Sequence, residues 1–259
     1  MIERGLEPDF PLAAQQELAA IVGPAKATEN VRDLRDRLWA SIDNDNSRDL
    51  DQLTVAESLA GGQVRILVAV ADVDALVRKG SALDGHAAHN TTSVYTPAAI
   101  FPMLPEALST NLTSLNEDQD RIAIVADMVF KDDGSIVTSE LYRAQVHNRA
   151  KLAYNSVAAW LTGTGPAPKG IVEVHGLDEN LRLQDRVAQQ LTALRHRHGA
   201  LSLETLQAQA IFAGDALSTL ELDLTNRATQ LIEEFRPRLT ADVADSELDV
   251  KPQTFLRWG

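Results

Sequence analysis

The sequence predicts an α+β fold in which a mixed, largely antiparallel sheet packs against helices. Two β-rich runs at 121–131 and 135–146 flank the turn Asp132-Asp133-Gly134, which is the pattern of an antiparallel hairpin. A second hairpin is indicated at 53–58 and 64–71, where two glycines separate the runs. Segments with helical periodicity come before, between and after these strand pairs, and they do not alternate with single strands. The order therefore disagrees with a regular alternation of parallel strands and helices.

Composition places the chain among globular proteins and restricts its chemistry. Its 259 residues are 44% hydrophobic and 24% charged, which suits one large domain or two smaller ones. The chain has no cysteine, so disulfides and thiolate metal sites are excluded. The N-terminus lacks a secretion signal and no apolar run is long enough to span a bilayer. We therefore expect a soluble, cytoplasmic protein with no membrane partner.

The formal net charge of −13 argues against nucleic-acid binding by bulk charge, because phosphate recognition normally needs a basic surface. A nuclease remains possible, since a bound metal and a local basic path can hold a phosphodiester. The basic residues are scattered, apart from one group at 143–151 and the run 195–198.

The N-terminal part reads as a helical lead-in over residues 1–38. Leu12, Leu18 and Ile21 indicate an amphipathic helix over 12–22, which Gly23-Pro24 ends. A second helix is predicted at 29–39, where apolar residues recur at helical spacing. Both helices are too short to form a domain alone, so we expect them to pack on the main body.

The main body is predicted over 39–235. Its run 64–71 is β-branched and nearly continuous, which is typical of a central strand buried on both faces. The other predicted elements are an extended segment at 39–42, helices or helical turns at 72–78, 81–90, 106–111, 152–161 and 178–197, a hairpin at 208–213 and 216–223, and a helix from 225. Pro237 is expected to interrupt that helix. The tail 236–259 alternates in a way that suggests one or two barrel-like strands.

The most concentrated charge of one sign lies in the segment before the first hairpin. Asp43, Asp45, Asp49 and Asp51 fall within nine consecutive residues. Crowded carboxylates repel one another, so a fold that gathers them usually supplies a cation. Oxygen ligands favour Mg²⁺ or Mn²⁺ over zinc. The alternative is an acidic loop that is simply solvated.

Further motifs follow this loop in a fixed order. They are Val68-Ala69-Val70-Ala71-Asp72-Val73, Gly80-Ser81-Ala82-Leu83-Asp84, Thr92-Ser93-Val94-Tyr95-Thr96-Pro97, Pro102-Met103-Leu104-Pro105-Glu106-Ala107-Leu108-Ser109, Ser114-Leu115-Asn116, Arg149-Ala150-Lys151-Leu152-Ala153-Tyr154 and Leu231-Ile232-Glu233-Glu234-Phe235. In this order and at these spacings they resemble the RNase II family, the exoribonucleases with an RNB catalytic domain. The resemblance implies the first half of an RNB-like catalytic domain. It also implies Mg²⁺- or Mn²⁺-dependent 3′-to-5′ hydrolysis of single-stranded RNA to nucleoside 5′-monophosphates.

The resemblance also implies roles for single residues. The family pattern has aspartates at the first, seventh, ninth and tenth positions of the loop, and Asp43, Asp49 and Asp51 match the first three of these. Gln52 stands at the tenth position, where its amide carbonyl can ligate a hard cation but adds no charge. The implied metal ligands are therefore Asp43, Asp49, Asp51 and Gln52. Asp49 and Asp51 are the implied catalytic residues.

Three residues match positions that contact RNA in the family. Tyr95 matches an aromatic residue at the last nucleotide, and Glu233 and Glu234 match a pair of which one binds the terminal ribose. Stacking on a tyrosine tolerates any base, and a contact to the 2′-hydroxyl distinguishes RNA from DNA. The alternatives are a half-buried strand tyrosine and two acids on a helix surface.

Two other functions remain open. The resemblance ends after Phe235, and with Gln52 in the loop this favours a catalytically impaired, RNA-binding relative as the alternative to an active enzyme. A domain that binds a divalent cation for structural reasons, without RNA, is the remaining possibility.

Overall fold

A seven-stranded sheet forms the centre of the molecule in this computed structural model, which describes residues 1–96, 99–200, 207–213, 216–223 and 225–244. The strand order is β1-β8-β7-β4-β3-β2-β9. Only the outer pairs β1–β8 and β2–β9 are parallel, so the sheet is mixed and largely antiparallel, as predicted. The strands are β1 (Arg32–Asp33), β2 (Ala40–Asp43), β3 (Gln52–Ser58), β4 (Val64–Ala71), β7 (Asp120–Phe130), β8 (Ile136–His147) and β9 (Ala150–Ala153).

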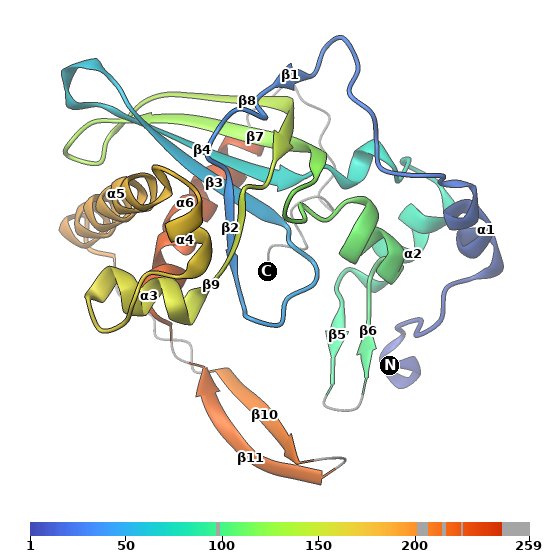
Figure 1. The fold of residues 1–259 in the computed structure, drawn as a ribbon. Coiled ribbons are helices and arrows are strands. Elements are labelled where there is room, and N and C mark those ends of the chain that lie inside the picture. Colours follow the sequence, from blue (N-terminus) through green and yellow to red (C-terminus); the bar gives the residue numbers. More distant parts are fainter. Residues whose placement is uncertain (97–98, 201–206, 214–215, 224, 245–259) are drawn as a thin grey trace.

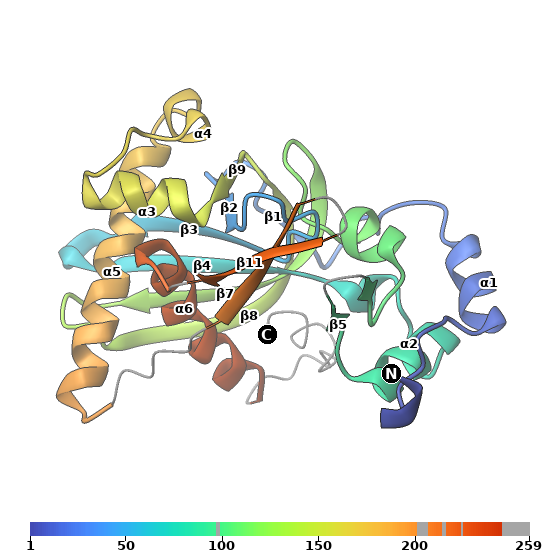
Figure 2. The same cartoon turned by 90° about the horizontal axis from the view of Figure 1, so that it is seen from below.

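Four helices from the second half of the chain cover one face of this sheet (Figures 1 and 2). They are α3 (Tyr154–Thr162), α4 (Lys169–Glu173), α5 (Leu177–Arg197) and α6 (Arg227–Ala244). Helices α1 (Leu12–Ala20) and α2 (Ala82–Asn90) and the small hairpin of β5 (Val94–Tyr95) and β6 (Ile100–Phe101) gather at one end. The hairpin of β10 (Gln207–Ala213) and β11 (Ala216–Asp223) extends away from the body. Short helical turns lie at Ile2–Arg4, Ala60–Gly62, Val73–Ala75 and Leu108–Leu112. Within the described ranges, no helix is both long and apolar enough to cross a bilayer.

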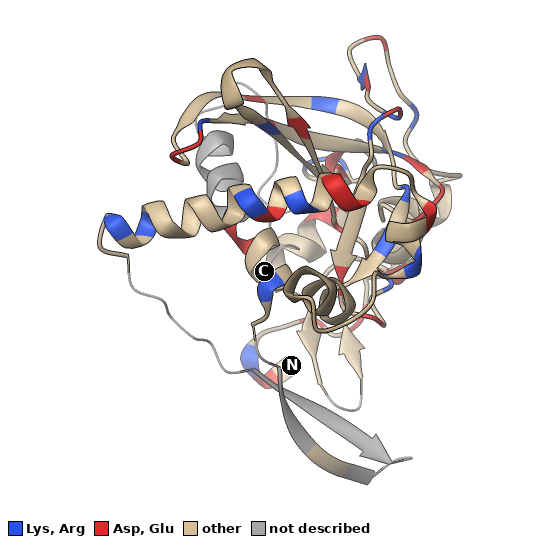
Figure 3. Ribbon diagram, turned by 60° about the vertical axis from the view of Figure 1, so that its left-hand side comes forward, with Lys and Arg blue, Asp and Glu red and all other residues tan. Residues whose placement is uncertain are grey.

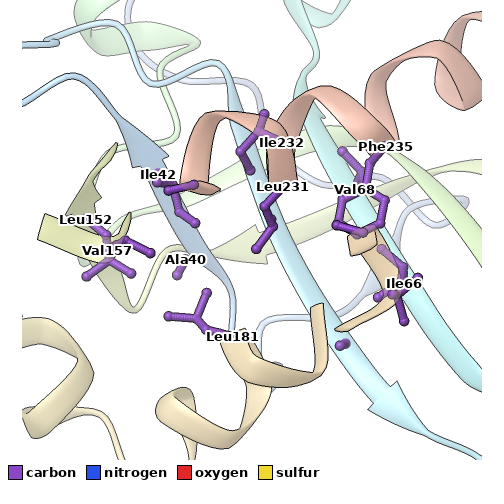
Figure 4. Close-up of a cluster of buried hydrophobic side chains, with 14 of the residues drawn as sticks. Ala40, Ile42, Ile66, Val68, Leu152, Val157, Leu181, Leu231, Ile232 and Phe235 are labelled. Atoms are coloured by element: carbon purple, nitrogen blue, oxygen red, sulfur yellow. The ribbon is translucent and has the colours of Figure 1, made fainter. Parts of the chain in front are cut away.

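The central strand β4 explains why the sequence forms this layered core. Ile66 and Val68 belong to the cluster under the helices, whereas Leu67 and Ala69 belong to a second cluster on the opposite face. Side chains alternate between the faces of a strand, so an uninterrupted apolar run is buried on both sides. Figure 4 shows the first cluster, in which side chains from β2, β4 and β9 meet those of α3, α5 and α6. The prediction of a central buried strand is confirmed.

Residues 29–39 do not form the predicted helix. They contain β1 and turns, and their backbone donors are used elsewhere: the amide of Leu34 donates to the carbonyl of Gln145 in β8 at 2.9 Å. The indole of Trp39 donates to the carbonyl of Leu34 at 2.8 Å. Trp39 is fully buried, and Leu38 packs against the same cluster. The apolar spacing was therefore a sign of burial against the sheet and not of helical periodicity.

The C-terminal helix is longer than the sequence predicted. Helix α6 continues through Pro237 to Ala244, so the predicted interruption and the predicted strands over 236–244 are wrong. Leu231, Ile232 and Phe235 are buried, and this packing stabilises the turns before the proline. One missing backbone donor is therefore insufficient to end the helix there. Residues 245–259 lie outside the described part of the chain, and the division into 1–38, 39–235 and 236–259 stays a prediction.

Two smaller differences concern the segment that follows β8. Residues 150–153 form the edge strand β9, although the predicted helix began at residue 152. Helix α4 begins at Lys169, just before the end of the loop that was predicted over 162–170. The predicted hairpins at 53–71, 121–146 and 208–223 are all present, with residues 214–215 outside the described part.

Candidate functional site

The acidic segment is the loop that joins β2 to β3. The two strands pair at Ala40 and Thr54 and then separate, which opens the loop between Asp43, the last residue of β2, and Gln52, the first of β3. In Figure 1 this loop lies beside the β5–β6 hairpin. Short pairing at the base of the loop thus places the carboxylates together at one end of the sheet.

A cavity of about 850 Å³ lies between the acidic loop and the opposite wall. The loop side contributes Asp43, Asn44, Asn46, Ser47, Arg48, Asp49 and Asp51. The opposite wall includes Thr92, Ser93, Tyr95, Ile100, Pro102, Met103, Leu104, Glu106, Ser109 and Thr110. Asp43, Asp49 and Asp51, the three predicted aspartate ligands, therefore face one space, and Asp45 is not among its lining residues.

The end of the loop before β3 is fixed by hydrogen bonds to a buried serine and its neighbour. The amide of Leu50 donates to Oγ of Ser114 at 2.9 Å, and the amide of Leu115 donates to the carbonyl of Leu50 at 2.8 Å. The amide of Ala71 in β4 donates to the carbonyl of Asp51 at 3.0 Å. Ser114 is fully buried, so its hydroxyl takes the place of water for the Leu50 amide.

The start of the loop is held by a different set of contacts. Asp43 Oδ1 accepts hydrogen bonds from the amide of Asn44 at 2.7 Å and from Oγ of Ser47 at 3.0 Å. The ammonium Nζ of Lys151 in β9 donates to the carbonyl of Ser47 at 2.6 Å. A cation on the neighbouring strand thus fixes the turn that carries the carboxylates.

Burial raises the pKa of Asp43 above its ordinary value, and the nearby charge of Asp49 acts in the same direction. The hydrogen bonds from Asn44 and Ser47 and the charge of Lys151 only partly oppose this rise in pKa. A divalent cation between Asp43 and Asp49 would relieve both the desolvation and the repulsion.

The donor set fits magnesium or manganese by its chemistry. Every predicted ligand offers oxygen, and Mg²⁺ is commonly held by one or two carboxylates together with water and substrate phosphates. In the described part of the chain, no three carboxylate or imidazole groups are close enough together to form a ready-made metal site. The residues therefore suit an ion that keeps part of its water shell and do not suit a fully protein-ligated cage.

Gln52 has a different environment from the three aspartates. Its side chain is 4% exposed and its Nε2 donates to the carbonyl of Ile42 at 3.0 Å, which joins β3 to β2 where their backbone pairing has stopped. Gln52 is not among the residues that line the cavity. The structure thus places Gln52 at the base of the loop and gives its amide a backbone partner.

The predicted RNA contacts fall in two separate places. Tyr95 is 68% exposed and lines the cavity with Ile100 across the β5–β6 hairpin. Glu233 and Glu234 lie on α6 and do not line it. Glu234 is buried and accepts hydrogen bonds from Thr192 at 2.8 Å and from Arg195. Its contacts connect α6 to α5, whereas Glu233 is exposed.

The structure adds site residues that the sequence did not single out. Lys151 and Ser114 lie within quoted motifs, but nothing in their spacing indicated that they hold the loop. Arg48 stands between Ser47 and Asp49 in the loop, and Glu106 faces it from the opposite wall. The position of Arg48 between the aspartates was the one signal in the sequence for this pair. Glu106 lies in a different segment, and nothing in the sequence connected it to Arg48.

Comparisons with known proteins identify the family of this chain. The RNB domain family matches residues 31–245. Ribonuclease R of Escherichia coli (strain K12) is 33% identical over 235 residues, which cover 87% of this chain and 28% of that protein. Ribonuclease R of Vibrio cholerae is 32% identical over 243 residues, covering 93% of this chain and 29% of that protein. The chain thus spans less than a third of the length of these two relatives.

Solved structures show the same fold. Mycoplasma genitalium RNase R in complex with double-stranded RNA superposes with a TM-score of 0.83 at 24% identity, covering 94% of this chain and 43% of that one. Yeast Ssd1, described as a pseudonuclease, gives a TM-score of 0.63 at 16% identity, covering 86% of this chain and 27% of that one. Because the family match spans most of the sequence, this chain belongs to the RNB domain family.

Proposed function

We propose that the chain carries the metal-binding part of a hydrolytic exoribonuclease that shortens single-stranded RNA from its 3′ end and releases nucleoside 5′-monophosphates. The observation that carries this proposal is the cavity that Asp43, Asp49 and Asp51 share with the exposed ring of Tyr95. One wall offers oxygen ligands for a catalytic metal and the other offers an aromatic face on which a base can stack, so the cavity combines a means of cleaving RNA with a means of holding it.

The side chains divide the work as follows. Asp43 and Asp49 would hold Mg²⁺ or Mn²⁺, which supplies a Lewis acid for the phosphoryl oxygen and a more acidic water. Asp51, at the end of the loop, orients the attacking water and accepts its proton. Tyr95 stacks on the terminal base without demanding a sequence. Glu233 is the exposed member of its pair and is the one we assign to the terminal ribose.

Asp51→Asn tests this assignment against a control from the same loop. We expect the variant to lose hydrolysis of a 5′-labelled single-stranded RNA in Mg²⁺ or Mn²⁺ while its RNA affinity stays within about threefold, because the carboxylate acts mainly on the reaction. Asp45→Asn removes an equal charge outside the cavity and should leave the ladder of shortened products unchanged. Equal loss in both variants, or full activity in Asp51→Asn, would contradict the role of Asp51.

One observation favours a second candidate, an RNA-binding protein without efficient catalysis. Gln52 bonds to a backbone carbonyl at a position where the family pattern has an acid, and the fold is also found in a protein described as a pseudonuclease. The same assay separates the two functions. A mobility shift of the labelled RNA with no shortening in either metal would support the binder and refute the enzyme.

A further inference from the structure

The charges that line the cavity pose a problem for binding a polyanion. Asp43, Asp49, Asp51 and Glu106 are all acidic, and Arg48 is the single lysine or arginine among the described residues that line the cavity. A bound divalent cation offsets part of the negative charge at the loop. The phosphates farther along an RNA strand would still face Glu106 without any protein cation except Arg48.

Arg48 and Glu106 face each other from opposite sides of this cavity. Arg48 belongs to the acidic loop, and Glu106 follows Pro105 on the opposite wall. Nη1 of Arg48 lies 3.0 Å from Oε1 of Glu106, so an ion pair connects the two walls. The backbone of Glu106 is fixed independently, because its carbonyl accepts a hydrogen bond from Thr110 Oγ1 at 3.0 Å.

This ion pair is well suited to exchange partners. The two side chains are 74% and 63% exposed, and solvated pairs of this kind add little to stability. A guanidinium binds two oxygens of a phosphate through parallel N–H donors, which gives a stronger and more directional contact than an exposed single ion pair. Separating Arg48 from Glu106 thus costs little, and binding a phosphate offers a better partner.

We propose that Arg48 binds a backbone phosphate of the RNA and that Glu106 competes with the RNA for it. This inference rests on the proposed function for its ligand, a single-stranded RNA. Without RNA, Glu106 occupies the guanidinium across the cavity. When RNA enters, the guanidinium turns from the carboxylate to the phosphate, and Glu106 thereby sets the affinity of the site.

A double-mutant cycle measures this competition without any hydrolysis. The affinity of the whole chain for a 5′-fluorescein single-stranded RNA is followed by fluorescence anisotropy with Ca²⁺ in place of Mg²⁺ or Mn²⁺, at several salt concentrations, and a gel checks that the RNA keeps its length. Arg48→Ala should weaken binding about fivefold or more and lower the salt slope by about 0.7, the value for one phosphate contact on a single strand. Glu106→Gln should tighten binding severalfold, because it releases Arg48. In the Arg48→Ala background, the gain from Glu106→Gln should shrink to the small part that comes from removing one negative charge.

Two further variants make the test specific. Arg48→Lys keeps the charge but not the paired donors, and we expect an affinity between those of the parent chain and Arg48→Ala. Arg186→Ala removes an equal charge from the exposed side of α5, along which Figure 3 shows other basic residues, and should bind RNA like the parent chain. Both side chains of the pair are exposed, so circular dichroism should be the same for all variants.

The outcomes separate this inference from the proposed function. Arg48→Ala with parental affinity, or a Glu106→Gln gain that is equally large without Arg48, would overturn the competition. A loss in Arg186→Ala equal to that in Arg48→Ala would replace it with an effect of total charge. If the parent chain binds RNA but does not shorten it with metal, the enzyme proposal fails, and the cycle still decides the role of Arg48. If no variant binds RNA, both fail.

Discussion

Removing the hydroxyl of Ser114 should destabilise the acidic loop and the fold together. Ser114 is fully buried, its Oγ accepts from the Leu50 amide at 2.9 Å, and it donates to Oδ1 of Asn116 at 2.9 Å. In Ser114→Ala the Leu50 amide, on a residue 2% exposed, is left buried without its acceptor. A lost neutral hydrogen bond costs about 0.5–1.5 kcal/mol, but a buried donor without a partner costs about 1–3 kcal/mol. We therefore expect Ser114→Ala to lower the free energy of unfolding by about 1–3 kcal/mol, the cost of a buried donor without a partner.

Urea unfolding gives this value directly. The midpoint should fall by the amount that corresponds to about 1–3 kcal/mol with an unchanged m-value, and exchange of the Leu50 amide should accelerate. Ser156→Ala is the matched control: its hydroxyl is exposed and bonds to the carbonyl of Ala153, so it should change stability by less than about 0.5 kcal/mol. Equal effects of the two variants would show that the Leu50 amide finds another acceptor, and the reasoning would be refuted.

Three other changes test separate contacts. Lys151→Met should accelerate amide exchange at 44–47, since the Ser47 carbonyl loses its donor, whereas Lys151→Arg should retain most of the protection. Burial acts to raise the pKa of Asp120, but hydrogen bonds to His147 and Arg35 outweigh it and lower this pKa. The stability that Asp120 adds is therefore present above its unfolded pKa, and the excess of wild type over Asp120→Asn in urea unfolding should shrink below about pH 4. Phe235→Ala should lower the free energy of unfolding by about 3–5 kcal/mol in the same assay, because the ring is fully buried under the sheet.

Local sequence was sufficient where an element and its partner are close in the chain. The hairpin of β7 and β8 was predicted because its turn residues and both alternating strands fall within one short segment. The burial of β4 on both faces was predicted because its eight residues are apolar apart from Arg65, so neither face of the strand is polar. The acidic loop was recognised for a similar reason, since its carboxylates are contiguous in sequence.

Distant partners explain what the sequence did not predict. Residues 29–39 are not helical because they pair with β8, which lies more than a hundred residues away in the sequence. Strand β8 supplies the acceptor for the amide of Leu34. Glu234 was interpreted as an RNA ligand or a surface acid, yet it is paired with Arg195 and Thr192 on another helix. Lys151 is likewise far from the loop that it holds. Each of these contacts depends on tertiary packing, which neither periodicity nor spacing encodes.

Gln52 connects the loop geometry to the chemistry of the site. Its Nε2 donates to the Ile42 carbonyl at the point where β2 and β3 separate, so it takes over the pairing that the backbone gives up. An ionised aspartate at this position would place an acceptor against an acceptor, so the contact needs a side chain that can donate, such as an amide. The neutral amide adds no negative charge to the loop. The negative charge facing the cavity from the loop therefore comes from Asp43, Asp49 and Asp51, with Lys151 offsetting part of it. A phosphate backbone entering this space meets strong local repulsion unless a cation neutralises the carboxylates, and affinity for RNA and affinity for metal must rise together.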